Sequence, residues 1–117
     1  MKIVKKAKSI KALGNPPKKI SEYIGLVNSK TKNVSIARMI SPKGWCEPGQ
    51  KPEFDEYSIV LKGTLHVKTK HIKVDLKEGQ SVIMPAGTWV QYSTPKGAEY
   101  ISVCTPAFSP EKAHRDK

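Results

Sequence analysis

Three carboxylates, Glu53, Asp55 and Glu56, stand together at the start of an apolar stretch in a chain that is otherwise rich in lysine. A carboxylate that faces an apolar interior is costly unless a hydrogen bond, a cation or a ligand satisfies it. Desolvation also raises the pKa of such a carboxyl group, which can then bind a polar ligand or transfer a proton near neutral pH. This segment therefore holds the first candidates for chemistry.

The pattern that must position these acids is one of short strands separated by turns. Apolar and polar residues alternate with period two, and Gly, Pro, Asn or Ser clusters recur every eight to twelve residues, which is typical of a β-sandwich or barrel. The sequence predicts a hairpin with a tight turn at Lys62-Gly63. The expected strands are residues 23–27, 34–40, 56–61, 64–69, 72–76, 81–84, 89–93 and 99–105.

The 117 residues are enough for one domain with a single core. We expect one domain over residues 1–117, with a basic lead-in at 1–19, a β-barrel at 20–105 and a tail at 106–117. The lead-in has helical spacing but fits an edge strand equally well. The tail holds two prolines, and a solvated terminus is favoured over a segment that folds back onto the barrel mouth.

Glycine, proline and acid positions carry a resemblance to the cupin superfamily, whose motifs are G(X)5HXH(X)3–4E(X)6G and G(X)5PXG(X)2H(X)3N. The residues that match these motifs are Gly44, Glu56, Gly63, Gly79, Pro85 and Gly87. The histidine positions hold Gln50, Pro52 and Val90, and the asparagine position holds Thr94. The resemblance spans roughly residues 34–105 and implies an all-β fold, the cupin-type double-stranded β-helix or jelly-roll barrel.

The metal chemistry that the resemblance would imply lacks its ligands in this chain. Of the four ligand positions only Glu56 is kept, and a divalent metal usually needs three or four fitting side chains. His66 is expected on the outer face of its strand, His71 in a turn and His114 in the tail. We therefore expect no metal site and no cofactor, although the sequence leaves open a weakly held ion at Glu56.

Strand parity places a set of residues on the barrel's inner face. Gln50 and Glu56 share that face if residues 50–60 are extended, and Tyr92 shares it with the Val90 position. Trp45 adds aromatic surface for a pocket. The candidate ligand-binding residues are therefore Gln50, Glu56, Tyr92 and Trp45, and desolvation should raise the pKa of Glu56 with no buried ammonium nearby. Catalytic residues are not assigned, and an inert structural role for Glu56 stays open.

Composition limits the partners. The formal charge is +11, but 19 of the 21 basic residues are lysines and only Arg38 and Arg115 are arginines, so scattered surface charge is favoured over a nucleic-acid site.

No apolar run reaches membrane-spanning length, and no secretory signal is visible. Cys46 and Cys104 are expected as small core residues. These features favour a cytoplasmic protein.

Three functions remain open. The first is binding of a small polar molecule in the barrel without a tightly held metal. The second is an enzyme of isomerase, lyase or oxygenase type that uses Glu56, so whether the protein is an enzyme is left undecided. The third is a basic nucleic-acid-binding module. Small cupins commonly pair, and exposed strand edges favour pairing, so the resemblance also implies a homodimer.

Overall fold

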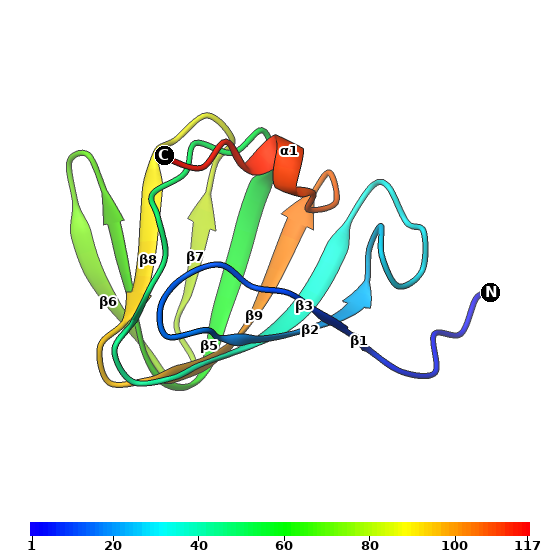
Figure 1. Cartoon of the computed structure of the whole chain (residues 1–117), viewed down its shortest axis with the longest axis horizontal. Helices are drawn as coiled ribbons and strands as arrows, with labels where there is room; N and C mark the ends of the chain where they lie inside the picture. Colours follow the sequence, from blue (N-terminus) through cyan, green and yellow to red (C-terminus); the bar gives the residue numbers. More distant parts are fainter.

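One long strand, β5 (Asp55–Thr69), joins the two sheets of the protein. The computed structural model describes all 117 residues. The first half of β5 belongs to sheet A, and its second half belongs to sheet B. The two sheets meet at the bottom of Figure 1 and diverge toward its top, where the C-terminal tail lies across them.

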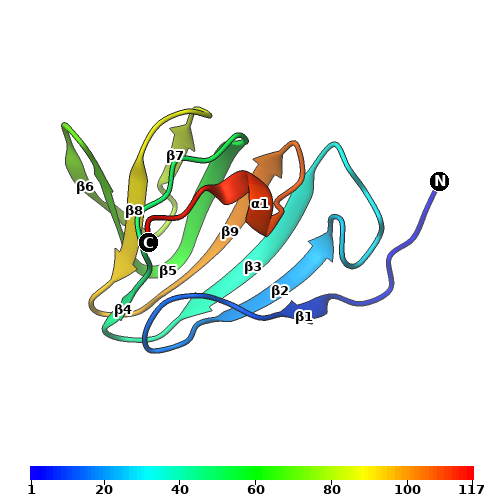
Figure 2. The same cartoon turned by 45° about the horizontal axis from the view of Figure 1, so that its top comes forward.

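All strand pairs in both sheets are antiparallel. Sheet A has the order β1 (Lys8–Ile10), β2 (Lys19–Ile24), β3 (Ser35–Ser41), β9 (Ala98–Thr105) and β5, with β7 (Ser81–Met84) on the other side of β5. Sheet B joins β4 (Trp45–Cys46), β8 (Val90–Thr94), β5 and β6 (Lys73–Lys77). Figure 2 shows β1, β2, β3, β9 and β5 side by side as one curved sheet. The expected all-β class is confirmed.

The expected hairpin at Lys62-Gly63 is wrong. The chain does not reverse there but continues as one strand, with a register shift between Val60 and Lys62 against β9. Gly63 has a φ of +77°, and glycine adopts such values at little cost. A glycine in the left-handed region produces a bulge or bend as readily as a turn. The bend lets one strand pass from sheet A to sheet B.

The two chain ends are more structured than the sequence indicates. Part of the lead-in forms the edge strand β1, which was one of the two alternatives. The tail forms a short helix, α1 (Pro110–Ala113), and then crosses above the sheets to a bridge between Gln50 and Arg115. The expectation of a solvated tail is therefore wrong. None of the helices has the length and apolar character needed to cross a membrane.

Inward-facing residues of the two sheets form the core. The larger cluster includes Trp45, Val60, Leu65 and Val90, each at most 1% exposed. Phe54, Cys104 and Ala113 form a second cluster, which attaches α1 to the sheet. Cys104 thus lies in the core as expected, but Cys46 is exposed. The tail is therefore held by buried apolar contacts.

Replacement of Gly63 should destabilise the fold more than replacement of another glycine with similar backbone geometry. A Cβ at Gly63 would lie 2.3 Å from the carbonyl oxygen of Gly97, whereas a Cβ at Gly79 meets nothing within 4 Å. Both residues have positive φ. We expect Gly63→Ala to lower the free energy of unfolding by about 3 kcal/mol or more, and Gly79→Ala by about 1–2 kcal/mol. Urea denaturation checks this, and equal losses would contradict the account of the bend.

Candidate functional site

A cavity of about 60 Å³ lies over the inner face of sheet A, beneath the tail. Its walls come from β2, β3, β5, β8 and β9, from the segment of residues 47–54 and from the tail residues Phe108 and Arg115. A space of this size takes a few water molecules or a small organic molecule. The lining combines apolar side chains with charged and hydroxyl groups. The cavity therefore presents several polar groups within a largely apolar lining.

Glu56 presents an unsatisfied carboxylate oxygen to this cavity. Its Oε1 atom is shielded from solvent and has no hydrogen-bond partner, and Oε2 has only a long contact of 3.9 Å from the Cys104 thiol. Burial, with a smaller contribution from Glu47, raises the pKa of Glu56 to about 7 although Lys18 acts in the opposite direction. Glu56 is therefore about half protonated at neutral pH. From the sequence we also expected burial to raise the pKa of this carboxyl group.

Two further buried groups beside Glu56 stay protonated. The Tyr92 hydroxyl is shielded and lies close to Glu56, but it makes no hydrogen bond of ordinary geometry. Burial and then the nearby carboxylates raise the pKa of Tyr92 well above its usual value, and the same causes raise the pKa of the Cys104 thiol. Glu56 is thus the group at this end of the cavity that can change its protonation state near neutral pH.

A buried ion pair lies at the other side of the cavity. The ammonium of Lys18 is 3.6 Å from Oε1 of Glu47, and their side chains are 8% and 9% exposed. Burial opposes the charge of Lys18, but Tyr100, Glu47 and Glu56 outweigh this effect and raise its pKa. Burial also raises the pKa of Glu47, against the influence of Lys18 and Arg115. Lys18 therefore stays protonated, and two cations act on Glu47 against the effect of burial.

Lys18 is also held by aromatic rings. Its ammonium lies 4.2 Å from the centre of the Trp45 ring and 3.4 Å from the Tyr100 hydroxyl. Such a cation over an aromatic face is stabilised most when it is desolvated. The sequence indicated no buried ammonium near Glu56, and this expectation is wrong. The lysine belongs to the basic lead-in, where nothing in the local pattern distinguishes it from its exposed neighbours.

Arg115 reaches the cavity from the tail. Residues 112–116 bond through their backbone to residues 49–53, with Lys51 and Glu53 donating to tail carbonyls and the Asp116 amide donating to Gly49. Outside the cavity, Trp89 donates to Asp116 over 2.9 Å and His114 pairs with Glu53. The Nε atom of Arg115 is shielded and unpartnered. The tail therefore adds a third unsatisfied group to the site.

The residues selected from the sequence are partly brought together. Gln50, Glu56 and Tyr92 line the cavity, but Trp45 does not and instead packs beneath Lys18. Glu53 and Asp55 do not line the cavity. Glu53 is exposed beside His114, and Asp55 accepts a hydrogen bond from the amide of Ala86. Lys18, Glu47 and Arg115 were not selected from the sequence, because they lie outside the strands that its alternation predicted.

The cavity does not fit the divalent metal that the cupin resemblance would imply. No three His, Cys, Asp or Glu side chains lie close enough together to hold a metal ion. Two of the three cavity carboxylates, Glu47 and Glu56, have Lys18 as a neighbouring cation, and this ammonium would repel a metal ion bound beside it. Positive charge in this cavity is supplied by side chains instead.

Glu56→Gln should stabilise the protein at alkaline pH. Because burial raises the folded-state pKa above the ordinary value of 4.5 to about 7, ionised Glu56 destabilises the fold. This cost is small below about pH 5, grows as pH rises and is complete above pH 7. Glutamine mimics the neutral acid, so the gain should be about 3 kcal/mol at pH 8 and below about 1 kcal/mol at pH 5. Thermal melts check this, with exposed Glu78→Gln as a control. A loss of stability at both pH values would show that Glu56 is a satisfied structural anion.

Comparison with known proteins agrees with the fold. Residues 14–109 match the family described as ethanolamine utilisation protein EutQ. A protein named endoribonuclease YbeY from Myxococcus xanthus is 43% identical over 101 residues, which cover 85% of this chain and 34% of that protein. This chain thus spans about a third of that relative's length.

Two solved structures are similar to the fold of this protein. The Clostridium difficile EutQ protein is 25% identical with a TM-score of 0.65, over 81% of this chain and 74% of that one. An RmlC-like cupin from Shewanella frigidimarina is 17% identical with a TM-score of 0.73, over 92% and 90% of the two chains. With the family match covering most of its length, the chain belongs to the EutQ family and has the cupin jelly-roll fold.

Proposed function

We propose that this protein binds a small polar organic molecule in the cavity beneath its tail, without a tightly held metal. The observation that carries the proposal is the set of three shielded, unpartnered atoms on one cavity: Glu56 Oε1, the Tyr92 hydroxyl and Arg115 Nε. Each such atom costs about 1–3 kcal/mol in the folded state. A ligand that hydrogen-bonds to all three would recover that cost.

Glu22, another buried carboxylate of the cavity wall, differs from Glu56 in its hydrogen-bond partners. Glu22 is 2% exposed, but its Oε2 accepts hydrogen bonds from the amides of Val27 and Asn28 at 3.0 and 2.8 Å. That acid is satisfied by the loop it stabilises. Glu56 lies on the same sheet without such partners. The difference separates a structural acid from one that is free to meet a ligand.

A second candidate function is acid–base catalysis by Glu56 on the bound molecule. It is favoured by one observation, the pKa of about 7, because a catalytic group works best when its pKa is close to the operating pH. Isomerase or lyase chemistry that moves one proton would suit it. We do not extend the activity in the name of the endoribonuclease relative to this chain, which spans about a third of that protein.

A ligand screen tests the binding proposal. We expect at least one small probe among ethanolamine, glycerol, glycolamide and lactate, which span positive, neutral and negative charge, to raise the melting temperature by several degrees at saturation. The shift should persist in a chelator, and Tyr92→Phe or Arg115→Gln should reduce it strongly. Tyr23→Phe, at an exposed tyrosine of β2 that does not line the cavity, is the matched control and should leave it unchanged. A shift that survives both cavity substitutions, or a wider library of small polar molecules without any hit, would refute the proposal.

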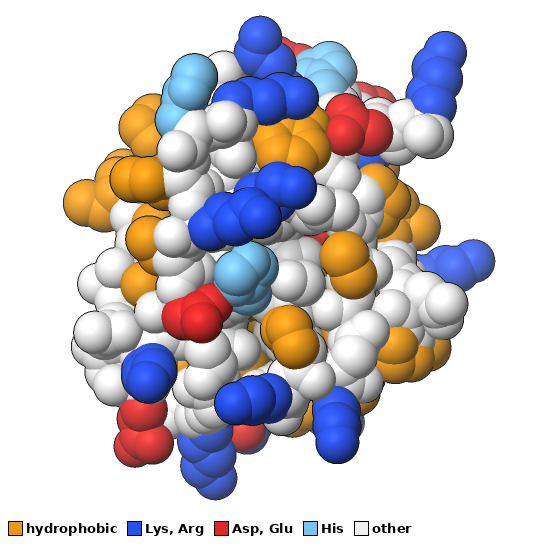
Figure 3. Space-filling view, turned by 90° about the vertical axis from the view of Figure 1, so that its left-hand side faces the viewer, with side chains coloured by type: hydrophobic (Ala, Val, Ile, Leu, Met, Phe, Trp, Pro, Cys, Tyr) orange, Lys and Arg blue, Asp and Glu red, His pale blue; other side chains and the backbone are white.

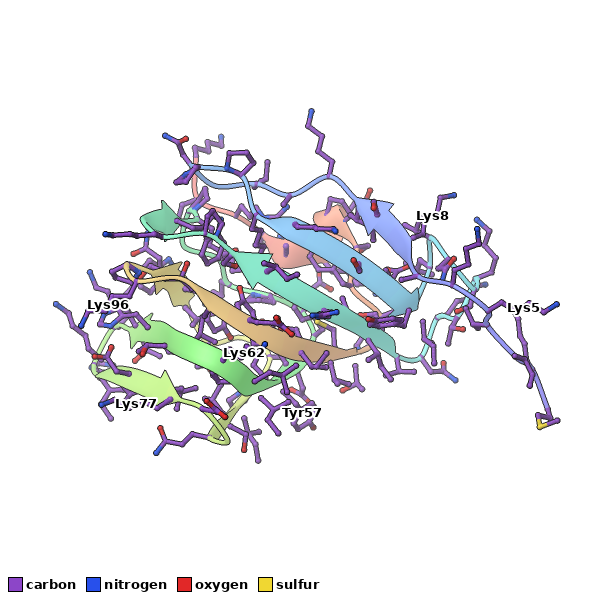
Figure 4. The ribbon with its side chains drawn as sticks, turned by 90° about the horizontal axis from the view of Figure 1, so that it is seen from below. Lys5, Lys8, Tyr57, Lys62, Lys77 and Lys96 are labelled. Carbon is purple, nitrogen blue, oxygen red and sulfur yellow. The ribbon has the colours of Figure 1, made fainter.

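We also propose that two copies pair through the outer face of sheet A. Four apolar side chains lie in one row of register partners across β3, β9, β5 and β7: Ile36, Val103, Tyr57 and Ile83. Ile83 is 70% exposed and Tyr57 39% exposed, and contiguous exposed apolar surface of this kind marks interfaces. Figure 4 looks onto this face, with Tyr57 at one end of β5.

Light scattering tests the pairing. We expect a mass of twice the 13.0 kDa of one chain at micromolar concentration. Ile83→Glu should halve that mass, because it places a charge on the apolar row at its most exposed side chain, where pairing would bury it. Ile72→Glu, at an equally accessible residue in the β5–β6 turn, should not. A monomeric wild-type protein would contradict the proposal.

A further inference from the structure

The outer face of sheet B carries a concentration of lysines that the cavity does not use. Strand alternation directs Thr64, His66 and Lys68 of β5 outward, together with the register partners Lys77, Asp75 and Lys73 of β6. Lys70 follows β5, and Lys96 adjoins Lys77 in a recess. We call the group of Lys68, Lys70, Lys73, Lys77 and Lys96 the lysine face. Figure 3 looks onto this side of the molecule, where basic side chains are spread widely with fewer acidic ones among them.

The positive charge of the lysine face is not neutralised within the protein. Asp75 is the acid that lies among these lysines on the strands, and it already pairs with His66. Glu78 is the next acid along the chain, in the turn that follows β6. None of the five lysines makes an ion pair. With five lysines and one acid among them, the face carries a net positive charge, which attracts polyanions over about a Debye length.

Two of these lysines oppose each other directly. Lys68 and Lys73 are register partners on β5 and β6, and like charges at directly opposite positions destabilise a sheet. A local arrangement that costs stability without an evident structural gain is expected at functional surfaces. A bound anion between the two ammonium groups would turn this repulsion into attraction.

A polar recess adjoins the pair and has the character of an anion site. It has a volume of about 210 Å³ and is lined by Thr64, His66, Asp75, Lys77, Pro95 and Lys96. Hydroxyl, imidazole and ammonium groups face the recess together with one carboxylate, Asp75, which pairs with His66. Lys73 and Lys77 lie four residues apart on one strand, which is about 13 Å. The lysine face is thus long enough to contact several successive phosphates of a nucleic acid strand.

We propose that the lysine face binds the phosphate backbone of a nucleic acid duplex without sequence preference. A duplex is favoured over a single strand because the face offers no free aromatic ring on which bases could stack: Trp89 at its border is covered by Lys70 at 4.3 Å and bonded to Asp116. Lysines without arginine contact phosphates as point charges but do not read guanine edges. This site is separate from the cavity, and its failure would leave the cavity proposal intact.

Fluorescence anisotropy with duplexes of about 20 base pairs tests the proposal. We expect micromolar binding at about 50 mM salt, with log K falling against log salt at a slope of about −3 for three to four phosphate contacts. Duplex RNA and DNA form two arms, with single-stranded RNA and polyglutamate as competing partners. Tighter binding to a single strand or to polyglutamate than to either duplex would overturn the assignment, as would no binding at about 100 μM protein.

A matched pair of double variants separates the face from overall charge. Lys68→Gln with Lys73→Gln should weaken duplex binding about 10-fold or more and reduce the salt slope by about 2. Lys5→Gln with Lys8→Gln removes the same charge from the N-terminal segment, remote from Lys77 and Lys96 in Figure 4, and should change binding less than about 2-fold. Equal weakening by both pairs would overturn the proposal.

The melting temperature gives a second test, because it distinguishes a lysine pair that costs stability from one that stabilises the sheet. Lys68→Gln alone should raise the melting temperature at low salt while it weakens duplex binding, because it removes the repulsion from Lys73. The gain should vanish at about 1 M salt, where the Debye length is about 3 Å. A lower melting temperature in this variant would show that Lys68 stabilises the sheet, and the argument from unrelieved repulsion would fail.

Discussion

The buried ammonium of Lys18 is the constraint on which the interior of this protein depends. Glu47 lies beside this side chain and Glu56 within reach of its charge, and Trp45 and Tyr100 enclose it. Two carboxylates in an apolar barrel would repel each other and cost several kcal/mol without a cation. In this chain a lysine from the N-terminal segment and an arginine from the C-terminal tail supply that positive charge. The two chain ends therefore complete the site rather than merely flank the barrel.

The buried ammonium of Lys18 also influences which cavity groups can bind a ligand or transfer a proton, although the cavity has no set of metal ligands. Lys18 lies 3.6 Å from Glu47 and lowers the pKa of both Glu47 and Glu56, but burial outweighs its effect at each acid. Glu56, with a pKa of about 7, is thereby poised between two protonation states near neutral pH. Acids whose pKa values are shifted by burial and by a specific charged neighbour are a feature of functional sites. Such an acid is suited to bind a polar molecule or to transfer a proton.

Period-two alternation was sufficient to predict the all-β fold and the inward set Gln50, Glu56 and Tyr92, because every second residue of a barrel strand faces the interior. It could not reveal Lys18, whose segment has no strong periodicity, nor Arg115, whose tail is positioned by backbone hydrogen bonds and by burial of Ala113. The hairpin at Gly63 was wrong for a related reason: a positive φ is common to turns and bulges, and only the partner strands decide between them. Local signals thus identify the sheet, while long-range packing decides which charges meet inside it.

Titration of the Glu56 side-chain carboxyl by carbon NMR tests the account of the cavity most directly. Glutamate labelled at its carboxyl carbon would be measured in the wild-type protein and in Lys18→Met, with the Glu56 signal assigned by its loss in a Glu56 variant. The account predicts a midpoint near pH 7 in the wild-type protein and a higher midpoint in Lys18→Met, because removal of the ammonium removes the charge that favours ionisation. A wild-type midpoint in the ordinary range near 4.5, or a midpoint that does not move in Lys18→Met, would contradict it.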